Sequence, residues 1–375
     1  MMTSNEFQAK MMNAKKLLDS ESVALTYRSF ETHRSSLPFV SVVIPCFNEE
    51  RFIAEVLQNL AGQYERERYE IVVVDGMSTD GTRKVIADFA AQNRDIAVRV
   101  IDNPARVIPV AVNLGIREAQ GKIIIRMDAH SVPSVDYVRR CVELVREDKA
   151  AVVGMPWHIK PGGDSVVARA IALAVAHPFG VGDAKYRLTN ASARLVDCVP
   201  FGAFKKGLWE ELGGFNEALL TNEDYEFYYR VRKGGRKILL DTAAHCDYFA
   251  RSSLGELAKQ YFRYGHWKAQ MVKLHPSSIR LRQLAAPSSV GYASLTVLLG
   301  LFWPRGFWLL LPLLVLYVVL AAIFALKLAW NDGDWKLIFV VPLVFFVIHV
   351  VWGSSFLLGL IRSARGPGRI AKALA

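Results

Sequence analysis

The 375-residue chain has few cysteines, no glycine-rich loop after its first apolar run and no apolar stretch near its start. Its four cysteines are scattered and none belongs to a CxxC pair, which argues against a disulfide framework or a zinc site and is typical of a reduced, cytosolic domain. The residues after Met1 do not form a basic start followed by an apolar core, so we expect no secretory signal.

The first apolar run, 40–45, is followed by Cys46-Phe47-Asn48 and not by the G-x-G-x-x-G sequence of a dinucleotide-binding turn. This argues against a dehydrogenase. The formal net charge is +11, because 46 lysines and arginines outnumber 35 acidic residues. The basic residues form no isolated run, however, and no zinc-finger or RNP-type pattern occurs. We therefore expect no nucleic-acid partner.

Apolar residues are distributed unevenly along the chain. They make up 52% of the whole, but residues 284–361 are mostly Leu, Val, Phe, Ile, Ala and Trp. Three segments of this region carry no charged residue, namely 283–304, 306–326 and 337–361. Each has about 20 residues or more, which is enough to cross roughly 30 Å of hydrocarbon.

Basic residues flank this apolar region on both sides, and the positive-inside rule places both flanks in the cytoplasm. That requires an even number of crossings. We expect spans near 306–330 and 337–361, with 283–304 re-entrant or a third span, the acidic link 331–334 outside and Arg305 inside. The prediction is a multi-pass protein of the cell inner membrane with a cytoplasmic globular part. The flanking residues are Lys268, Lys273, Arg280, Arg282, Arg362, Arg365, Arg369 and Lys372.

From Phe39 onward, short β-branched runs alternate with amphipathic stretches. Apolar runs of about five residues between helices are typical of strands buried on both faces of a parallel sheet. The alternation predicts an open α/β sheet whose ligands bind outside the carboxyl ends of the strands. The expected strands are 40–45, 71–75, 98–102 and 123–128, and the expected helices are 49–60, one opening near 79–80, 108–119 and 135–146.

Polar residues at the ends of the first two strands are candidate ligand contacts. Asn48 and Glu49 follow the first strand, where helix capping and dipole compensation explain them equally well. Asp75 ends the second strand. Because Thr79 or Asp80 can cap the next helix, we expect Asp75 to be free to accept a hydrogen bond from a ligand.

The fourth strand delivers Asp128 to its end, and His130 follows two residues later. In an extended segment, residues i and i+2 project to the same side, so the two side chains could share one divalent cation. Oxygen and nitrogen ligands together suit Mn²⁺, with Mg²⁺ as second choice. The alternative is a loop aspartate beside an exposed histidine.

Two further groups of polar residues lie on predicted helices. Glu223 and Asp224 open one helix, where they either compensate its dipole or face the cleft as a general base. Gln260, Arg263 and Tyr264 are spaced i, i+3 and i+4, which places them on one face of another helix. That helix could instead lie at the membrane interface with its aromatic residues at headgroup level.

The order and spacing of these features resemble the family 2 glycosyltransferases with the GT-A fold, over residues 39–276. Segments 179–182, 197–204 and 260–265 are more similar still to the succinoglycan-biosynthesis branch, whose members make exopolysaccharide repeat units. The motifs that carry the resemblance are Pro45-x-x-Asn48-Glu49, Asp75, the D-x-D-type Asp128-Ala129-His130, Glu223-Asp224 and the Q-x-x-R-W-like Gln260-x-x-Arg263-Tyr264.

The resemblance implies a mostly parallel, Rossmann-like GT-A domain over 39–276. A lead-in, 1–38, precedes it, and a membrane region, 277–362, and a basic cytoplasmic tail, 363–375, follow. The resemblance also implies a role for each matching residue. The general base is Asp224, with Glu223 as second choice, and the metal ligands are Asp128 and His130. The nucleotide sugar is bound by Pro45, Glu49, Asp75, Arg106, Asp128, Gln260, Arg263 and Tyr264, and the acceptor side is formed by Phe201, Gly202 and Ala203.

The activity that the resemblance implies is inverting transfer of a hexose from a nucleotide sugar, such as UDP-glucose, to a lipid-linked oligosaccharide. One alternative is a processive synthase that also exports its polymer, although two or three membrane segments are few for a channel. Another is a catalytically dead membrane-bound binding protein of the same fold. Acidic residues at every expected position argue against that alternative.

Overall fold

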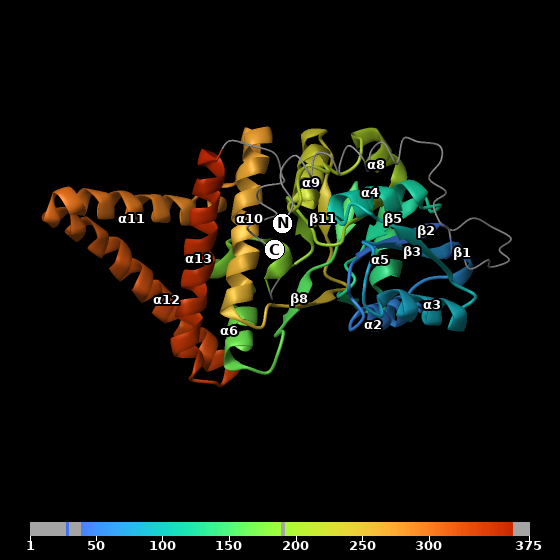
Figure 1. Cartoon of the computed structure of the whole chain (residues 1–375), viewed down its shortest axis with the longest axis horizontal. Coiled ribbons are helices and arrows are strands. Elements are labelled where there is room, and N and C mark those ends of the chain that lie inside the picture. The colour runs from blue at the N-terminus through green and yellow to red at the C-terminus, as the bar shows by residue number, and fades with distance from the viewer. Residues whose placement is uncertain (1–27, 30–38, 189–191, 363–375) are drawn as a thin grey trace.

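The computed structural model describes residues 28–29, 39–188 and 192–362 (Figure 1). Except for residues 28–29, the expected lead-in, 1–38, lies outside the described residues, as does the basic tail, 363–375. The remainder forms a mixed α/β domain followed by three long apolar helices.

A nine-stranded sheet forms the centre of the α/β domain. Its strands, from one edge to the other, are β1 (Arg28–Ser29), β4 (Ala97–Asp102), β3 (Tyr69–Asp75), β2 (Val40–Cys46), β5 (Ile123–Arg126), β10 (Ala203–Lys205), β7 (Val152–Gly154), β11 (Ile238–Leu240) and β9 (Arg194–Leu195). Strands β4, β3, β2 and β5 run parallel to one another, as do β7 and β11. Strand β10 is antiparallel to both of its neighbours. The predicted mostly parallel α/β sheet is therefore confirmed.

The continuous apolar runs of these strands are explained by cover on both faces of the sheet. Alternate residues of a strand point to opposite faces. Val42 and Ile44 accordingly pack in one core cluster with helices α2, α3 and α5, whereas Val43 packs in the other with α4, α8 and α9. These helices are α2 (Ile53–Leu60), α3 (Thr82–Gln92), α5 (Tyr137–Arg146), α4 (Ile108–Glu118), α8 (Lys206–Leu212) and α9 (Glu223–Lys233).

A second, three-stranded sheet lies between the main sheet and the long helices. It consists of β6 (Val132–Pro133), β12 (Cys246–Phe249) and β8 (Trp157–Lys160). The helices near it are α6 (Val166–Val175), α7 (Pro178–Val181) and α10 (Leu254–Leu274). Short 3₁₀ turns complete the chain: η1 (Arg66–Arg68), η2 (Lys185–Arg187), η3 (Pro276–Ser278), η4 (Leu281–Gln283) and η5 (Pro304–Leu309).

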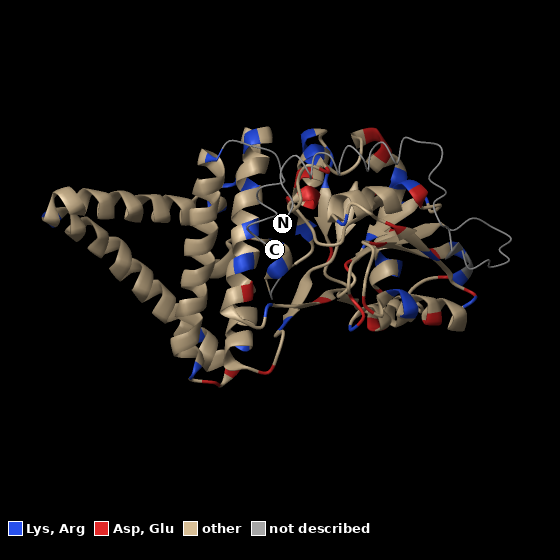
Figure 2. Cartoon of the chain, in the orientation of Figure 1, with Lys and Arg blue, Asp and Glu red and all other residues tan. Residues whose placement is uncertain are grey.

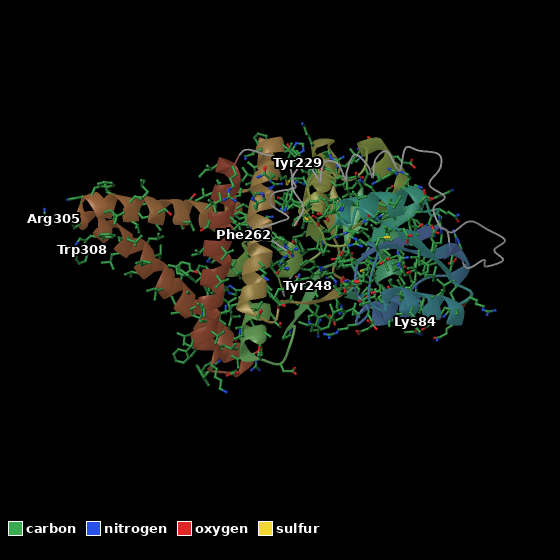
Figure 3. All side chains as sticks on the ribbon, viewed as in Figure 1. Lys84, Tyr229, Tyr248, Phe262, Arg305 and Trp308 are labelled. Atoms are coloured by element: carbon green, nitrogen blue, oxygen red, sulfur yellow. The ribbon has the colours of Figure 1, made fainter. Side chains whose placement is uncertain are left out.

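Three helices are long and apolar enough to cross a membrane: α11 (Ala285–Phe302), α12 (Leu310–Asp332) and α13 (Leu337–Ile361). Helices α11 and α12 form a V that projects from the molecule, and Arg305 and Trp308 lie at its tip (Figures 1 and 3). Figure 2 shows that charged residues are sparse along all three helices. These features support a membrane protein.

Helix α13 contacts the α/β domain at both of its ends. Before its first turn, Asp332 and Asp334 pair with Arg169 of α6 at 3.6 and 2.5 Å. After its last turn, the carbonyl oxygen of Arg362 accepts a hydrogen bond from Lys273 of α10 at 2.7 Å. Between these ends, α13 runs beside α10 (Figure 1). The acidic link thus lies against the globular domain, which is at odds with the expectation that the two lie on opposite sides of the bilayer.

A labelling experiment tests this placement. In membrane vesicles, Asn331→Cys is expected to react with an impermeant maleimide from the same side as Lys84→Cys, which lies far from the apolar helices (Figure 3). Background labelling is expected to be low because all four native cysteines are buried. Labelling of the two variants from opposite sides would restore the original expectation.

Candidate active site

A single cavity of about 870 Å³ extends from the carboxyl end of β5 to the apolar helices. At one end it is lined by Asp128, Glu223 and Asp224, and at the other by Val290 of α11 and Leu316 of α12. Polar and apolar binding surfaces are therefore continuous. Of the predicted site residues, those lining this cavity are Asp128, His130, Phe201, Glu223, Asp224, Gln260, Arg263 and Tyr264.

Arg126, the last residue of β5, connects the acids of this cavity. Its side chain is almost fully buried, and one terminal nitrogen lies 3.0 Å from Asp128 Oδ1 and 3.5 Å from Glu223 Oε1. The guanidinium therefore offsets the repulsion between carboxylates that come from separate elements. The sequence analysis missed Arg126, although an arginine closing an apolar strand directly before Asp128 was a visible indication.

Glu223 and Asp224 occupy the first turn of α9, after Asn222 in a left-handed conformation with φ of +66°. Glu223 is buried, whereas Asp224 is partly exposed to the cavity. Burial is the main cause that raises the pKa of both carboxyls, and the neighbouring Asp224 raises that of Glu223 further. Arg126 acts in the opposite direction on both. This raised pKa suits a group that must take up a proton near neutral pH.

His130 lies between Asp128 and Glu49. Its Nδ1 is 2.9 Å from Glu49 Oε1, and this hydrogen bond is the main cause that raises the pKa of His130. Nearby Asp128 raises the pKa of His130 as well. The Asp128 carboxylate and the second imidazole nitrogen of His130 are ligand types that suit Mn²⁺ or Mg²⁺, and Glu49 orients the imidazole. Glu49 does not line the cavity, but it is hydrogen-bonded to His130, which does.

A second group of potential metal ligands lies elsewhere. Within the described ranges, the three residues His158, His245 and Asp247 have ligand atoms within 4.8 Å of one another. They belong to the face of the small sheet that does not line the cavity, because the alternate residues Trp157 and Tyr248 face it. This group is therefore separate from Asp128 and His130.

Helix α10 places Gln260, Arg263 and Tyr264 along the cavity, as their spacing predicted. Gln260 is buried and donates hydrogen bonds to the hydroxyls of Tyr248 at 3.0 Å and Tyr264 at 3.1 Å. Arg263 is exposed. Other residues of α10, including Gly265, contact α13. The helix thus serves both the cavity and the apolar region, so the two interpretations of its sequence apply to different faces.

Asp75 does not have the free carboxylate that we expected. It is fully buried at the end of β3, where Oδ2 accepts a hydrogen bond from Arg83 Nε at 2.6 Å and Oδ1 accepts one from the Ser78 hydroxyl. The carboxylate therefore holds the loop after β3 in place, and it is not among the residues that line the cavity. Pro45 and Arg106 also lie outside that lining.

Two of the three expected acceptor-side residues do not reach the cavity. Ala203 is fully buried within β10, between β5 and β7. A Cβ on Gly202 would lie 2.3 Å from the Tyr228 hydroxyl, so this position is enclosed and requires glycine. Phe201 alone of the three lines the cavity. Gly202 and Ala203 therefore have a structural role, because the chain enters strand β10 of the main sheet at these residues.

Comparison with known proteins identifies the type of molecule that this chain resembles. Residues 41–211 match the family model described as glycosyl transferase family 2. The succinoglycan biosynthesis protein ExoA of Rhizobium meliloti is 30% identical over 315 residues, which cover 79% of this chain and 93% of that protein.

Two further proteins match over most of the chain. The first is named dolichyl N-acetyl-alpha-D-glucosaminyl phosphate 3-beta-D-2,3-diacetamido-2,3-dideoxy-beta-D-glucuronosyltransferase, from Methanococcus voltae, and is 26% identical over 86% of this chain and 98% of its own length. The second is a solved structure, the mannosyltransferase PcManGT from Pyrobaculum calidifontis in complex with GDP-Man and Mn²⁺. It superposes with a TM-score of 0.57 at 20% identity, over 92% of this chain and 93% of the other. This superposition supports the same fold.

Proposed function

The chain belongs to glycosyl transferase family 2, and we propose that it is a membrane-bound, inverting enzyme that extends a lipid-linked saccharide with a hexose. The donor is a nucleotide sugar such as UDP-glucose, and the product contributes to an exopolysaccharide or another cell-surface glycan. The observation that carries the proposal is the single cavity lined by both acidic residues and membrane-helix residues. The dolichyl phosphate saccharide in the name of the Methanococcus relative adds support for a lipid-linked acceptor.

In this proposal, Asp224 is the general base. It is partly exposed to the cavity, whereas Glu223 is buried and held by Arg126. Asp224 takes the proton from the acceptor hydroxyl while that oxygen attacks the anomeric carbon from the face opposite the leaving group. Such a base contributes about 10²–10⁴-fold to the rate. A single displacement of this kind inverts the anomeric configuration and needs no covalent intermediate.

The leaving group is a nucleoside diphosphate, whose negative charge requires compensation. Asp128 and His130 would hold a divalent cation, with Glu49 orienting the imidazole. A bound cation supplies Lewis-acid stabilisation of the departing diphosphate. Arg263, an exposed residue in the lining of the same cavity, contributes a fixed positive charge. This arrangement places fixed positive charges near the negative charge that develops on the departing diphosphate during transfer.

The apolar end of the cavity suits the lipid of the acceptor. Val290, Leu316, Leu320 and Ile348 line it, and they come from all three apolar helices. Helices α11 and α12 diverge from their joined tip toward α13 (Figure 1), and residues of all three helices line this cavity. The saccharide then lies at the acidic end while its lipid stays in the membrane.

The test is sugar transfer by membranes that contain the protein. We expect release of nucleoside diphosphate from one member of a panel of sugar nucleotides, and only when a lipid-linked acceptor is present. Release without any acceptor dependence, or no release from any donor, would contradict the proposal. Formation of long products would favour a processive synthase instead.

Metal removal gives a separate prediction. Chelation with EDTA should lower the transfer rate about tenfold or more, because a Lewis acid supplies several kcal/mol of charge stabilisation. Added Mn²⁺ should restore the rate in the wild type but not in His130→Ala. His158→Ala, which alters the separate histidine group, is the matched control and should respond like the wild type. The opposite pattern in the two variants would move the metal site to His158.

A further inference from the structure

Arg187 is a buried cation with no acidic partner in the part of the chain that the structure describes. It ends the turn η2, and only 7% of its surface is exposed. Among the described residues, no carboxylate oxygen lies within 4.0 Å of its guanidinium. Nε donates a hydrogen bond to the Tyr186 hydroxyl at 3.3 Å, and the Tyr264 hydroxyl also lies beside the guanidinium. By contrast, Arg126 in the same cavity pairs with two acids. No carboxylate of the described residues therefore offsets the charge of Arg187.

Aromatic rings fix the orientation of this guanidinium. Its central carbon lies 4.7 Å from the centroid of a Trp157 ring, 5.5 Å from that of Tyr186 and 6.0 Å from that of Tyr264. Trp157 in turn stacks on Tyr248 with ring centroids 4.1 Å apart. Such contacts hold a guanidinium plane rigidly and leave its edge to bind a planar or tetrahedral oxyanion through two N–H groups.

An arginine stays charged in a protein, and burying an unpaired charge is unfavourable. A ligand that carries negative charge would supply the missing partner. Basic residues outnumber acids in the lining of the cavity by six to three, and of the six, Arg126 and Arg282 pair with carboxylates. The six are Arg126, Arg187, Arg251, Arg263, Lys268 and Arg282.

The chain segment that carries Arg187 is attached to the membrane side of the cavity. The chain segment that leads to η2 begins at α7, where the Phe179 carbonyl oxygen lies 2.7 Å from His349 Nε2 of α13. The Phe179 ring also packs edge-on against Phe345 of α13. Arg187 also lies over the ring of Tyr264, which follows Arg263 on α10 at the polar end of the cavity. Arg187 therefore lies where the polar end and the membrane side of the cavity adjoin.

We propose that Arg187 binds the phosphate group that joins the acceptor saccharide to its lipid. A phosphate here lies between the acidic end of the cavity, which takes the saccharide, and the apolar end, which takes the lipid. Lys268 also lines the cavity, but burial lowers its pKa to about 7 and its Nζ donates a hydrogen bond to the Ser278 carbonyl oxygen at 3.2 Å. Arg187 therefore supplies the fixed positive charge. The identity of the lipid as an acceptor rests on the proposed function, whereas the phosphate site itself does not.

Direct binding tests the inference without turnover. The probe is farnesyl phosphate, with farnesol as its uncharged counterpart, measured on the purified full chain in neutral detergent. We expect the wild type to prefer the phosphate by about tenfold or more, as a charged hydrogen bond predicts. Arg187→Ala should lose this preference and Arg187→Lys should retain part of it. UDP affinity should stay within about twofold of the wild type in both variants.

Arg140→Ala is the matched control, because Arg140 pairs with Asp241 outside the cavity and its loss should not alter the preference. Equal wild-type affinity for farnesyl phosphate and farnesol would overturn the inference. So would a loss of UDP affinity in Arg187→Ala, which would assign the arginine to the donor, or full competition by phosphatidylglycerol, which would assign it to a membrane lipid. Retained binding without any sugar transfer would instead refute only the proposed function.

Discussion

Asp224→Asn is expected to lower kcat for sugar transfer by about 10²–10⁴-fold, the range that a general base contributes. The amide keeps the size of the side chain but cannot take the acceptor proton. Nucleotide affinity should change little, since the proposed donor contacts at Asp128 and Arg263 remain. The measurement is kcat with a saturating donor and acceptor, together with the dissociation constant for UDP.

Asp247→Asn provides the matched control for this substitution. It makes the same chemical change on the small sheet, outside the cavity, and should leave kcat near the wild-type value. Glu223→Gln separates the two acids of the pair: because Glu223 is buried and held by Arg126, its effect should appear in stability as well as in rate. An Asp224→Asn variant with wild-type kcat would remove Asp224 from its proposed role.

Arg126→Gln is expected to reduce both stability and activity. Removing one partner of a buried ion pair costs about 3–5 kcal/mol, because the remaining charges are left uncompensated. Arg126 is almost fully buried and faces both Asp128 and Glu223, so its loss should lower the melting temperature measurably. Arg126→Lys keeps the charge and should show a smaller loss.

The pH dependence of the Arg126 variant has a definite sign. The guanidinium lowers the pKa of Glu223 and Asp224, so its removal raises both. At neutral pH a smaller fraction of the base is then ionised, and the rate falls. The rate of Arg126→Gln should therefore recover as the pH rises, and the acidic limb of its kcat profile should lie at higher pH than that of the wild type. An unshifted limb would show that Arg126 does not control this pair.

The fold was largely predictable because its determinants are local in the sequence. Apolar runs such as 71–75, which need cover on both faces, are sufficient to indicate buried parallel strands, and Asp128 follows directly from the end of one such run. The position of Asp128 near Asp224 was also predictable, since the carboxyl ends of strands and the start of a helix lie at one edge of an open sheet. Both residues line the same cavity.

Other features depend on contacts between distant segments, which no local pattern records. Asp75 was expected to be free, but Arg83 from the following helix occupies its carboxylate. The cage around Arg187 combines rings from β8, η2 and α10. Likewise, the pairing of Arg169 with Asp334 joins residues 165 positions apart in the sequence.

The structure of the reaction product tests the central claim most directly. Purified protein is incubated with a nucleotide α-sugar and a lipid-linked acceptor, and the product is examined by mass spectrometry and by the anomeric coupling in its proton NMR spectrum. The account predicts one added sugar per acceptor, in the β configuration. A product with the α configuration would contradict a single displacement driven by Asp224, and a polymer of many sugars on one lipid would contradict the transfer of one sugar per acceptor.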